Sequence, residues 1–414
     1  MSFSPAPRIA GSVQPQLLRQ YRAIRAQSLA IAKPLSGEDQ SVQSMPDTSP
    51  TKWHLAHSTW FFERIVLARS PGYEPFDRRY DALFNSYYLS LGTPFARCSR
   101  GLLTRPSLAE IMAYRVHVDE EMETLLAHAG PERRTLTLLG LQHEQQHQEL
   151  MLTDIKHAFF CNPLYPAYST AAPMPLDVPA AQDWFAHPGG TTEIGHDGKG
   201  FAFDNEGPRH AVHLRPFKLA ARPVTNGEYR AFIEDGGYRR PGLWLSDGWA
   251  KKEQEGWTAP LYWLGQDRVF ALDGVRALDP GEPVAHVSFY EASAYAAWVG
   301  LRLPTEFEWE AIANRFPCDG NFLDLGVLRP RVNGAAKLFG DVWCWTRSSY
   351  DPYPGYRPFE GALGEYNGKF MVGQMVLRGG SCVTPVGHIR ATYRNFFAPA
   401  ARWQFSGIRL AADI

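Results

Sequence analysis

Apolar residues recur every three to four positions along the first 165 residues, a period that predicts amphipathic helices. The periodic segments cover residues 17–32, 51–64, 107–129 and 133–160. Ser49 and Pro50 are typical of an N-cap and a first helical residue, so the second helix is expected to begin there. Four helices joined by loops favour a four-helix bundle, a fold that builds metal sites from facing helices.

The pattern changes in the second half of the chain. Residues 166–184 are rich in Pro and Ala and predict a linker. From residue 185 the apolar segments are short, separated by Gly, Pro and Asn, and rich in aromatic residues, with short helices expected at 226–235, 290–299 and 305–314. We therefore expect a helical domain over 1–165 and an α+β domain over 185–414.

Two histidines lie on the apolar face of the predicted helix 133–160. His143 and His147 are four residues apart and project from one side, with Leu136 and Leu150 within about 40° of their mean direction. Burying an unpaired imidazole costs roughly 1–3 kcal/mol, so something must satisfy both rings. A shared metal ion would do so. Gln146 lies at the edge of the same face.

A third metal ligand is available on the helix 51–64. Trp53 and Trp60 define its apolar stripe, and His57 lies about 60° from the centre of that stripe, whereas His54 lies about 120° away. His57 is therefore the better candidate, and replacing His54 is expected to leave metal retention nearly intact. Three neutral histidines leave coordination positions open, which suits catalysis more than a structural role.

Composition narrows the class of protein. The chain has 42 Lys plus Arg against 43 Asp plus Glu, so no excess of charge favours nucleic acid or an acidic membrane as a partner. Its five cysteines are scattered and odd in number, which argues against a disulfide framework and for a reducing compartment. No segment has the length and apolar character of a signal peptide or a membrane span, so we expect a cytoplasmic protein.

The motifs of both halves together resemble the ergothioneine-type sulfoxide synthases. In the first half the matching runs are Ser49-Pro50, Leu55-Ala-His57 and residues 143–149. In the second half the runs that resemble the formylglycine-generating-enzyme fold are 203–206, 223–229, 303–306, 340–343, 377–381 and 405–409. The resemblance covers nearly the whole chain. It implies a DinB-like four-helix bundle followed by a formylglycine-generating-enzyme, C-type-lectin-like α+β domain.

The resemblance implies an iron-dependent oxidoreductase without haem. Such an enzyme uses Fe(II) and O2 to join the sulfur of cysteine to the imidazole C2 of hercynine, the trimethylated betaine of histidine, as a sulfoxide. The family's iron ligands correspond to His57, His143 and His147, and the glutamine that touches the hercynine imidazole corresponds to Gln146.

The resemblance also assigns roles outside the helices. The connection 77–106 is too long for a simple turn, and loops of this length are often functional. The resemblance places in this connection the paired tyrosines of the cysteine-using branch, Tyr87 and Tyr88, one of which would donate a proton. It also places there two arginines that would bind the carboxylate of the thiol substrate, Arg97 and Arg100. The substrate-contacting residues of the second half correspond to Asn395, Phe396 and Phe397.

Two positions depart from the family pattern. Phe396 and Phe397 stand where the branch that uses γ-glutamylcysteine has Trp and Asp, and losing that aspartate favours free cysteine as the sulfur donor. Cys344 stands where this fold commonly has glutamate, which puts any local polar contact of that glutamate in doubt. γ-Glutamylcysteine and a selenosugar stay open as alternative donors, although a selenosugar would leave the arginine pair without a role.

Other classes of enzyme share parts of the pattern. His143-Glu-Gln-Gln-His147 fits the H-E-x-x-H motif of zinc proteases, with Glu144 as general base, but His57 would then have no role. A metal-dependent thiol transferase on the same bundle would not need the large second domain. A formylglycine-generating enzyme needs two neighbouring cysteines, and Cys344 and Cys382 are the candidates, far apart in sequence. A binding module with a structural metal predicts a fourth ligand, which the sequence does not offer.

Overall fold

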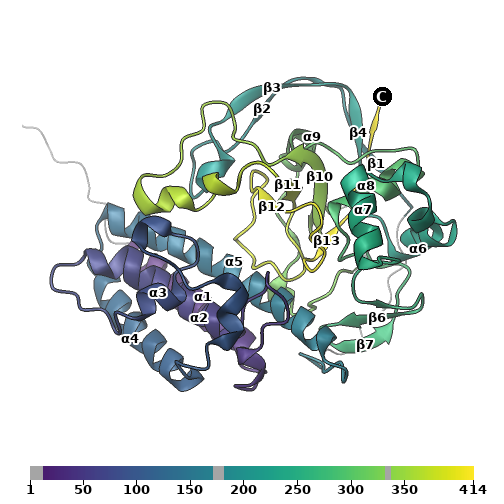
Figure 1. Ribbon diagram of the computed structural model, residues 1–414. Coiled ribbons are helices and arrows are strands. Elements are labelled where there is room, and N and C mark those ends of the chain that lie inside the picture. Colours follow the sequence, from purple (N-terminus) through teal and green to yellow (C-terminus); the bar gives the residue numbers. More distant parts are fainter. Residues whose placement is uncertain (1–12, 171–180, 332–336) are drawn as a thin grey trace, which may run out of the picture. The chain divides into compact units, whose positions relative to one another are not determined.

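The helices predicted in the first half of the chain form, with one short helix added. The computed structural model describes residues 13–170, 181–331 and 337–414, and the first of its two units ends at Ile155. The helices of this half, drawn in purple to blue in Figure 1, are α1 (Val13–Ala32), α2 (Thr51–Phe61), α3 (Tyr80–Phe84), α4 (Leu108–Leu126) and α5 (Pro131–Cys161). The helix α3 interrupts the long connection that the sequence predicts between α2 and α4.

The helix α2 is buried on all sides. Each of its eleven residues is buried, because α1, α3 and α4 all contact it. An apolar stripe marks the buried side only of a helix that keeps its other face in solvent, and α2 has no such face. His54, which the stripe places away from the buried side, is only 3% exposed. The expectation that His54 lies off the buried face is therefore wrong.

The start of α2 differs from the prediction by one residue. Pro50 is the N-cap residue, with no side-chain capping hydrogen bond, and the helix begins at Thr51. The hydroxyl of Ser49 instead accepts a hydrogen bond from Nη1 of Arg100, at 2.9 Å. The predicted N-cap at Ser49 is thus wrong, because a tertiary contact takes its side chain.

The second unit begins at Lys156, and its described residues contain four longer helices. These are α6 (Asn226–Glu234), α7 (Ser246–Glu255), α8 (Phe289–Trp298) and α9 (Glu306–Ala313). The three helices that the sequence predicts each begin with a capping box, in which a Ser or Thr and a Glu three residues later exchange hydrogen bonds. The helix α7 has no side-chain cap, so no capping motif marks its start in the sequence.

Short strands form the rest of the second unit, drawn in teal to yellow in Figure 1. The largest sheet has the order β12-β11-β10-β13, with β10 (Trp343–Ser349), β11 (Met375–Arg378), β12 (Asn395–Phe397) and β13 (Ser406–Gly407). A second sheet has the order β1-β4-β14, with β1 (Trp184–His187), β4 (Phe217–Ala220) and β14 (Ala411–Asp413). The C-terminal strand therefore pairs with a strand almost two hundred residues earlier.

Three smaller sheets contain the other strands described in this unit. They are β2 (Gly190–Ile194) with β3 (His210–Leu214), β5 (Trp263–Leu264) with β6 (Arg268–Ala271) and β7 (Gly274–Ala277), and β8 (Gly320–Asn321) with β9 (Phe339–Gly340). A buried ionic network joins α9 to β11, because Nη2 of Arg378 donates to Glu306 and Glu310 at 2.8 and 3.0 Å. Both carboxylates balance the charge of a guanidinium that is fully buried.

The cysteines, the helices and the predicted linker can be compared with the expectations from the sequence. All five cysteines are free thiols. Within the described ranges, no helix combines the length and the apolar character needed to cross a membrane. Residues 171–180 of the predicted linker lie outside the described residues, so the domain limits 1–165 and 185–414 stay a prediction.

Candidate metal centre

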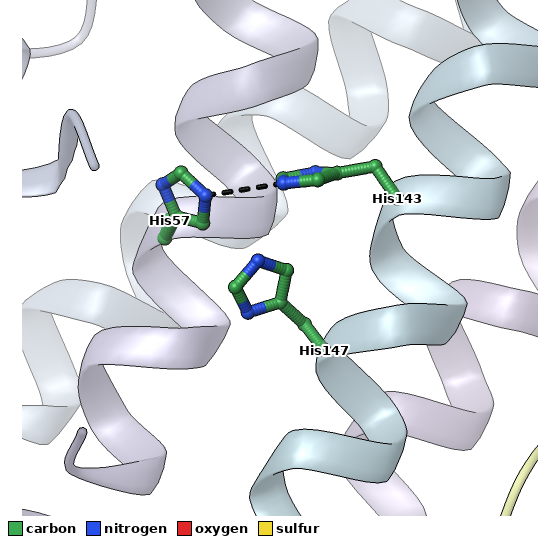
Figure 2. A group of neighbouring side chains, drawn as sticks. All are labelled: His57, His143 and His147. Atoms are coloured by element: carbon green, nitrogen blue, oxygen red, sulfur yellow. Dashed lines mark hydrogen bonds between the residues drawn. The ribbon is translucent and has the colours of Figure 1, made fainter. Parts of the chain in front are cut away.

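Three buried histidines converge between α2 and α5. His57 comes from α2, and His143 and His147 come from adjacent turns of α5 (Figure 2). One nitrogen of each ring lies within 4.8 Å of the other two, the one such group of three potential ligands among the described residues. Nε2 of His57 and Nε2 of His143 are 3.1 Å apart. Two nitrogens at about 2.1 Å from one metal, at right angles, lie about 3 Å apart, so the spacing fits a metal centre.

Hydrogen bonds on the outer side orient two of these rings. Nδ1 of His57 lies 2.6 Å from the carbonyl oxygen of Phe84, which can only accept, so Nδ1 carries the proton and Nε2 keeps its lone pair. Nδ1 of His147 lies 2.8 Å from Nδ1 of His54. Figure 2 shows the other nitrogen of His147 directed toward His57 and His143. Partners of this kind fix the orientation of metal-binding imidazoles.

All three imidazoles are neutral at neutral pH. Burial lowers the pKa of His143 to about 3 and holds the pKa of His57 and of His147 well below the ordinary value. Loss of hydration is the largest cause, since an imidazolium without water is unfavourable, and the neighbouring imidazoles add to it for His57 and His147. Neutral imidazole is the form that binds metal.

Aromatic rings form walls against His57 and His143. Trp53 stacks on His57 with ring centroids 4.6 Å apart and an interplanar angle of 12°, and Trp60 stacks on His57 at 5.6 Å and 15°. Phe61 contacts His143 at 4.5 Å. Such walls exclude water and lower the local dielectric, which strengthens the binding of charge to the imidazole nitrogens.

The two predicted tyrosines differ in exposure. Tyr88 is fully buried, and its ring centroid lies 5.7 Å from that of Trp60 and 6.5 Å from that of Phe61, two rings that contact the histidines. Asn85 holds this loop, donating to the carbonyl of Tyr88 at 2.9 Å and accepting from its N–H at 3.0 Å. Tyr87 lies beside Tyr88, with ring centroids 4.8 Å apart, and is partly exposed.

The two predicted arginines also differ. Arg97 is exposed, whereas Arg100 is 3% exposed and donates to the hydroxyls of Ser49 and Ser86 at 2.9 and 3.2 Å. Arg100 forms no ion pair with any carboxylate that the structure describes. Burial and the nearby charge of Arg97 lower the pKa of Arg100 to about 9. A buried cation without a counter-ion is costly, so this site is suited to an anionic group.

Glu144 faces away from the histidine cluster. Its carboxylate accepts hydrogen bonds from Arg25 at 3.0 Å, from Arg115 at 3.1 Å and from Ser28 at 2.6 Å. A carboxylate bound by two buried arginines is a poor proton acceptor, which leaves the zinc-protease alternative without its general base. Gln146 lies between the two histidines of α5 and is partly exposed.

The predicted residues of the second unit lie together on one strand. Asn395, Phe396 and Phe397 are β12, and all three are partly exposed. Phe396 stacks on Tyr350 with ring centroids 4.0 Å apart, and Asn395 accepts the N–H of Phe396 at 2.9 Å. The predicted site residues thus form one set in the first unit and one in the second.

Two buried residues beside the histidine cluster, Asp154 and His54, were not predicted from the sequence as part of the site. Oδ2 of Asp154 lies 3.0 Å from Nε2 of His54 and accepts the main-chain N–H of Ser49 at 2.8 Å. Asp154 is seven residues after His147, two helical turns on the same face, which is a signal that the sequence offered. The angle of His54 on the helix does not by itself reveal its contact with Asp154.

Comparison with known proteins agrees with this architecture. Residues 20–151 match the DinB superfamily, and residues 171–322 and 324–414 match the sulfatase-modifying factor enzyme 1-like domain. The chain is 33% identical to a hercynine oxygenase of Mycolicibacterium smegmatis, over 90% of this chain and 93% of that protein. It is 34% identical to the hercynine oxygenase of Mycolicibacterium thermoresistibile, over 89% of this chain and 88% of that protein. It is 33% identical to the hercynine oxygenase of Mycobacterium tuberculosis, over 89% of this chain and 92% of that protein.

These matches cover both units in one order and nearly the full length of each relative. The predicted fold class, a helical DinB-like bundle followed by an α+β domain, is confirmed. The resemblance inferred from the motifs is confirmed as well. This chain is an enzyme that belongs to the hercynine oxygenase family.

Proposed function

We propose that this enzyme is an Fe(II)- and O2-dependent sulfoxide synthase that joins the sulfur of cysteine to the imidazole C2 of hercynine. One C–H bond, one S–H bond and one O2 are consumed, and one C–S bond, one S=O bond and one water are formed. O2 accepts all four electrons, so no external reductant is needed. The observation that carries the proposal is the set of three neutral, buried imidazoles whose nitrogens converge in this chain. The chain is also similar to hercynine oxygenases over most of its length.

His57, His143 and His147 would hold the Fe(II). Imidazole suits iron, and three protein ligands leave positions for substrates. Bound Fe(II) supplies the redox chemistry that activates O2, which no protein side chain can provide. The aromatic rings around the histidines would keep bulk water out of this region.

Arg100, with Arg97, would bind the carboxylate of cysteine. Buried Arg100 forms no ion pair with a carboxylate of the described residues, which supports this role, because a substrate carboxylate would neutralise the guanidinium. Planar guanidinium groups grip a carboxylate through two parallel hydrogen bonds, which fixes orientation as well as position. The sulfur of the bound cysteine would thereby be held in a single direction.

Each unit carries residues that the resemblance assigns to hercynine, Gln146 in the first unit and the β12 residues in the second. Its trimethylammonium group has no N–H to donate and prefers aromatic faces, which Phe396 and Phe397 offer. Gln146 would hydrogen-bond the imidazole, and Asn395 would contact the substrate. With Phe397 at the position of the branch-specific aspartate, free cysteine is favoured over γ-glutamylcysteine as donor.

One of Tyr87 and Tyr88 would donate a proton during the oxidation. A proton delivered at that stage favours carbon–sulfur bond formation over simple oxidation of the thiol. The burial of Tyr88 against Trp60 and Phe61 supports the inner position for Tyr88. The ring of Tyr87 would cover Tyr88 on its outer side.

The test is a single-turnover experiment with defined donors. The protein is loaded with Fe(II) under anaerobic conditions, mixed with hercynine and cysteine, γ-glutamylcysteine or a selenosugar, and exposed to O2. Mass spectrometry of the product then identifies the donor. The cysteine sulfoxide is the expected product. A product from another donor alone would correct the donor, and loaded enzyme that forms no product with any donor would refute the activity.

A further inference from the structure

We propose that Asp154 and His54 form a hydrogen-bonded relay that positions His147 for the metal. The relay rests on the metal centre of the proposed function, and it adds two positioning residues that bind neither the metal nor a substrate. Asp154 and His147 lie on α5, and His54 lies on α2. The relay therefore connects the two helices that carry the three histidine ligands.

The direction of each hydrogen bond follows from the one before it. An ionised carboxylate only accepts, so the N–H that faces Oδ2 of Asp154 at 3.0 Å belongs to Nε2 of His54. A neutral imidazole carries one proton, so Nδ1 of His54 is an acceptor. Nδ1 of His147, 2.8 Å away, must then donate. The remaining nitrogen of His147, Nε2, keeps its lone pair and faces His57 and His143 (Figure 2).

The opposite arrangement is unfavourable. A proton on Nδ1 of His54 would place the lone pair of Nε2 against the carboxylate of Asp154. It would also force the proton of His147 onto Nε2, where it would block metal binding. His54, Asp154 and His147 are 3%, 5% and 9% exposed, so little water competes for these hydrogen bonds. Hydrogen bonds shielded in this way are electrostatically stronger than exposed ones.

Ser49 fixes the carboxylate at the end of the relay. Its main-chain N–H donates to the same oxygen of Asp154 that faces His54, at 2.8 Å. Its hydroxyl accepts from Arg100 at 2.9 Å. His57 is oriented differently, by the carbonyl of Phe84. The orientation of His57 is thus set by a main-chain group, whereas that of His147 depends on the side chains of His54 and Asp154, which can be replaced by mutation.

The first test reads the tautomers directly in the unaltered protein. The chain is labelled with 15N-histidine and loaded with Zn(II), and long-range 1H–15N correlation spectra report which ring nitrogen of each histidine is protonated. We expect the proton of His54 on Nε2 and that of His147 on Nδ1. A proton on Nδ1 of His54 would overturn the relay.

The second test compares two variants at position 54. His54→Phe keeps a ring but removes both nitrogens, and His54→Asn keeps an oxygen that can accept from Nδ1 of His147. Loss of an outer hydrogen-bond partner typically weakens metal binding about 10–100-fold. We therefore expect His54→Phe to bind Co(II) about 10–100-fold more weakly than the wild type, and His54→Asn to recover most of the lost affinity. The matched control is His128→Phe at an exposed histidine just after α4, which should bind Co(II) as the wild type does.

The outcomes separate the relay from the proposed activity. Metal affinity and tautomers are measured without turnover. A wild-type protein that binds Co(II) but forms no sulfoxide would therefore refute the proposed activity alone. The relay would still be supported or overturned by the tautomer spectra and the Co(II) affinities. Equal Co(II) affinity in folded His54→Phe and wild type overturns the relay. A wild type that takes up no metal overturns both.

Discussion

The guanidinium carbon of Arg100 lies 3.4 Å from the ring centroid of Trp53, and the same indole stacks on His57. A single aromatic ring thus joins the arginine assigned to the thiol substrate and an imidazole assigned to the metal. In cysteine, only two carbon atoms separate the carboxylate carbon from the sulfur. A carboxylate anchor this near to the histidines suits so small a donor.

Replacing Arg100 should weaken the binding of cysteine more than it affects folding. A hydrogen bond to a charged group contributes about 1.5–3 kcal/mol, so Arg100→Met is expected to raise the KM for cysteine at least about tenfold. The free energy of unfolding should stay within about 1 kcal/mol of wild type, because losing two bonds to serine hydroxyls is offset by no longer burying a charge. Steady-state kinetics and urea unfolding measure the two effects. An unchanged KM for cysteine would remove Arg100 from the donor site.

Removing a ligand histidine should abolish metal retention. His143→Ala or His147→Ala leaves two imidazoles of the three, and two monodentate ligands rarely hold Fe(II) against dialysis. Iron content after anaerobic loading and dialysis measures this, with His128→Ala as the control at an exposed position. Iron retained equally by all variants would reject the assignment of the ligands.

The sequence predicted those parts of the site and of the fold that depend on the spacing of neighbouring residues. His143 and His147 are four residues apart on one helix, and α6, α8 and α9 begin with capping sequences that act within four residues. Local rules of this kind can be read without knowing what lies beside the helix. The same applies to the periodicity of α5.

Contacts between distant segments were not predictable in this way. The burial of His54 could not be predicted from the stripe of α2, because α1, α3 and α4 bury this helix on every side. The burial of Arg100 likewise arises from packing against Trp53 and Ser49, which come from another segment of the chain. The pairing of β14 with β4 likewise depends on chain segments far apart.

The stability of the second unit should rise with pH above neutrality. Burial lowers the pKa of Lys156 to about 7, and its Nζ lies 2.7 Å from Nε2 of His286. In the unfolded chain the pKa of lysine is about 10.4, so between about pH 7 and pH 10 the unfolded state binds a proton that the folded state lacks. The free energy of unfolding therefore increases with pH by up to about 1.4 kcal/mol per unit.

Lys156→Met tests the origin of this dependence. The variant keeps an apolar stem without the ammonium, so it should be more stable than wild type near pH 7 and should gain less on raising the pH to about 9. Urea unfolding at both pH values provides the comparison. If the two proteins respond to pH equally, Lys156 is not the group responsible.

Enlarging Gly140 should destabilise the bundle. A Cβ at this position of α5 would lie 2.6 Å from Cε1 of Phe62, closer than any normal contact. Overpacking of this kind costs about 1–3 kcal/mol, so Gly140→Ala should unfold at a lower temperature. Gly130→Ala is the matched control, because a Cβ there meets no atom within 4 Å. A variant as stable as wild type would show that the ring of Phe62 can move without cost.

Removing the tyrosine hydroxyls should redirect the oxidation from carbon–sulfur bond formation to cysteine sulfinate. Phe keeps the rings that pack in the loop, so Tyr87→Phe and Tyr88→Phe change proton donation more than structure. We expect the larger diversion in Tyr88→Phe, because Tyr88 is buried against two rings that contact the histidines. The ratio of sulfinate to sulfoxide per O2 consumed measures it, with Tyr73→Phe, whose hydroxyl donates to Glu63, as control. A double variant with the wild-type ratio would place the proton donor elsewhere.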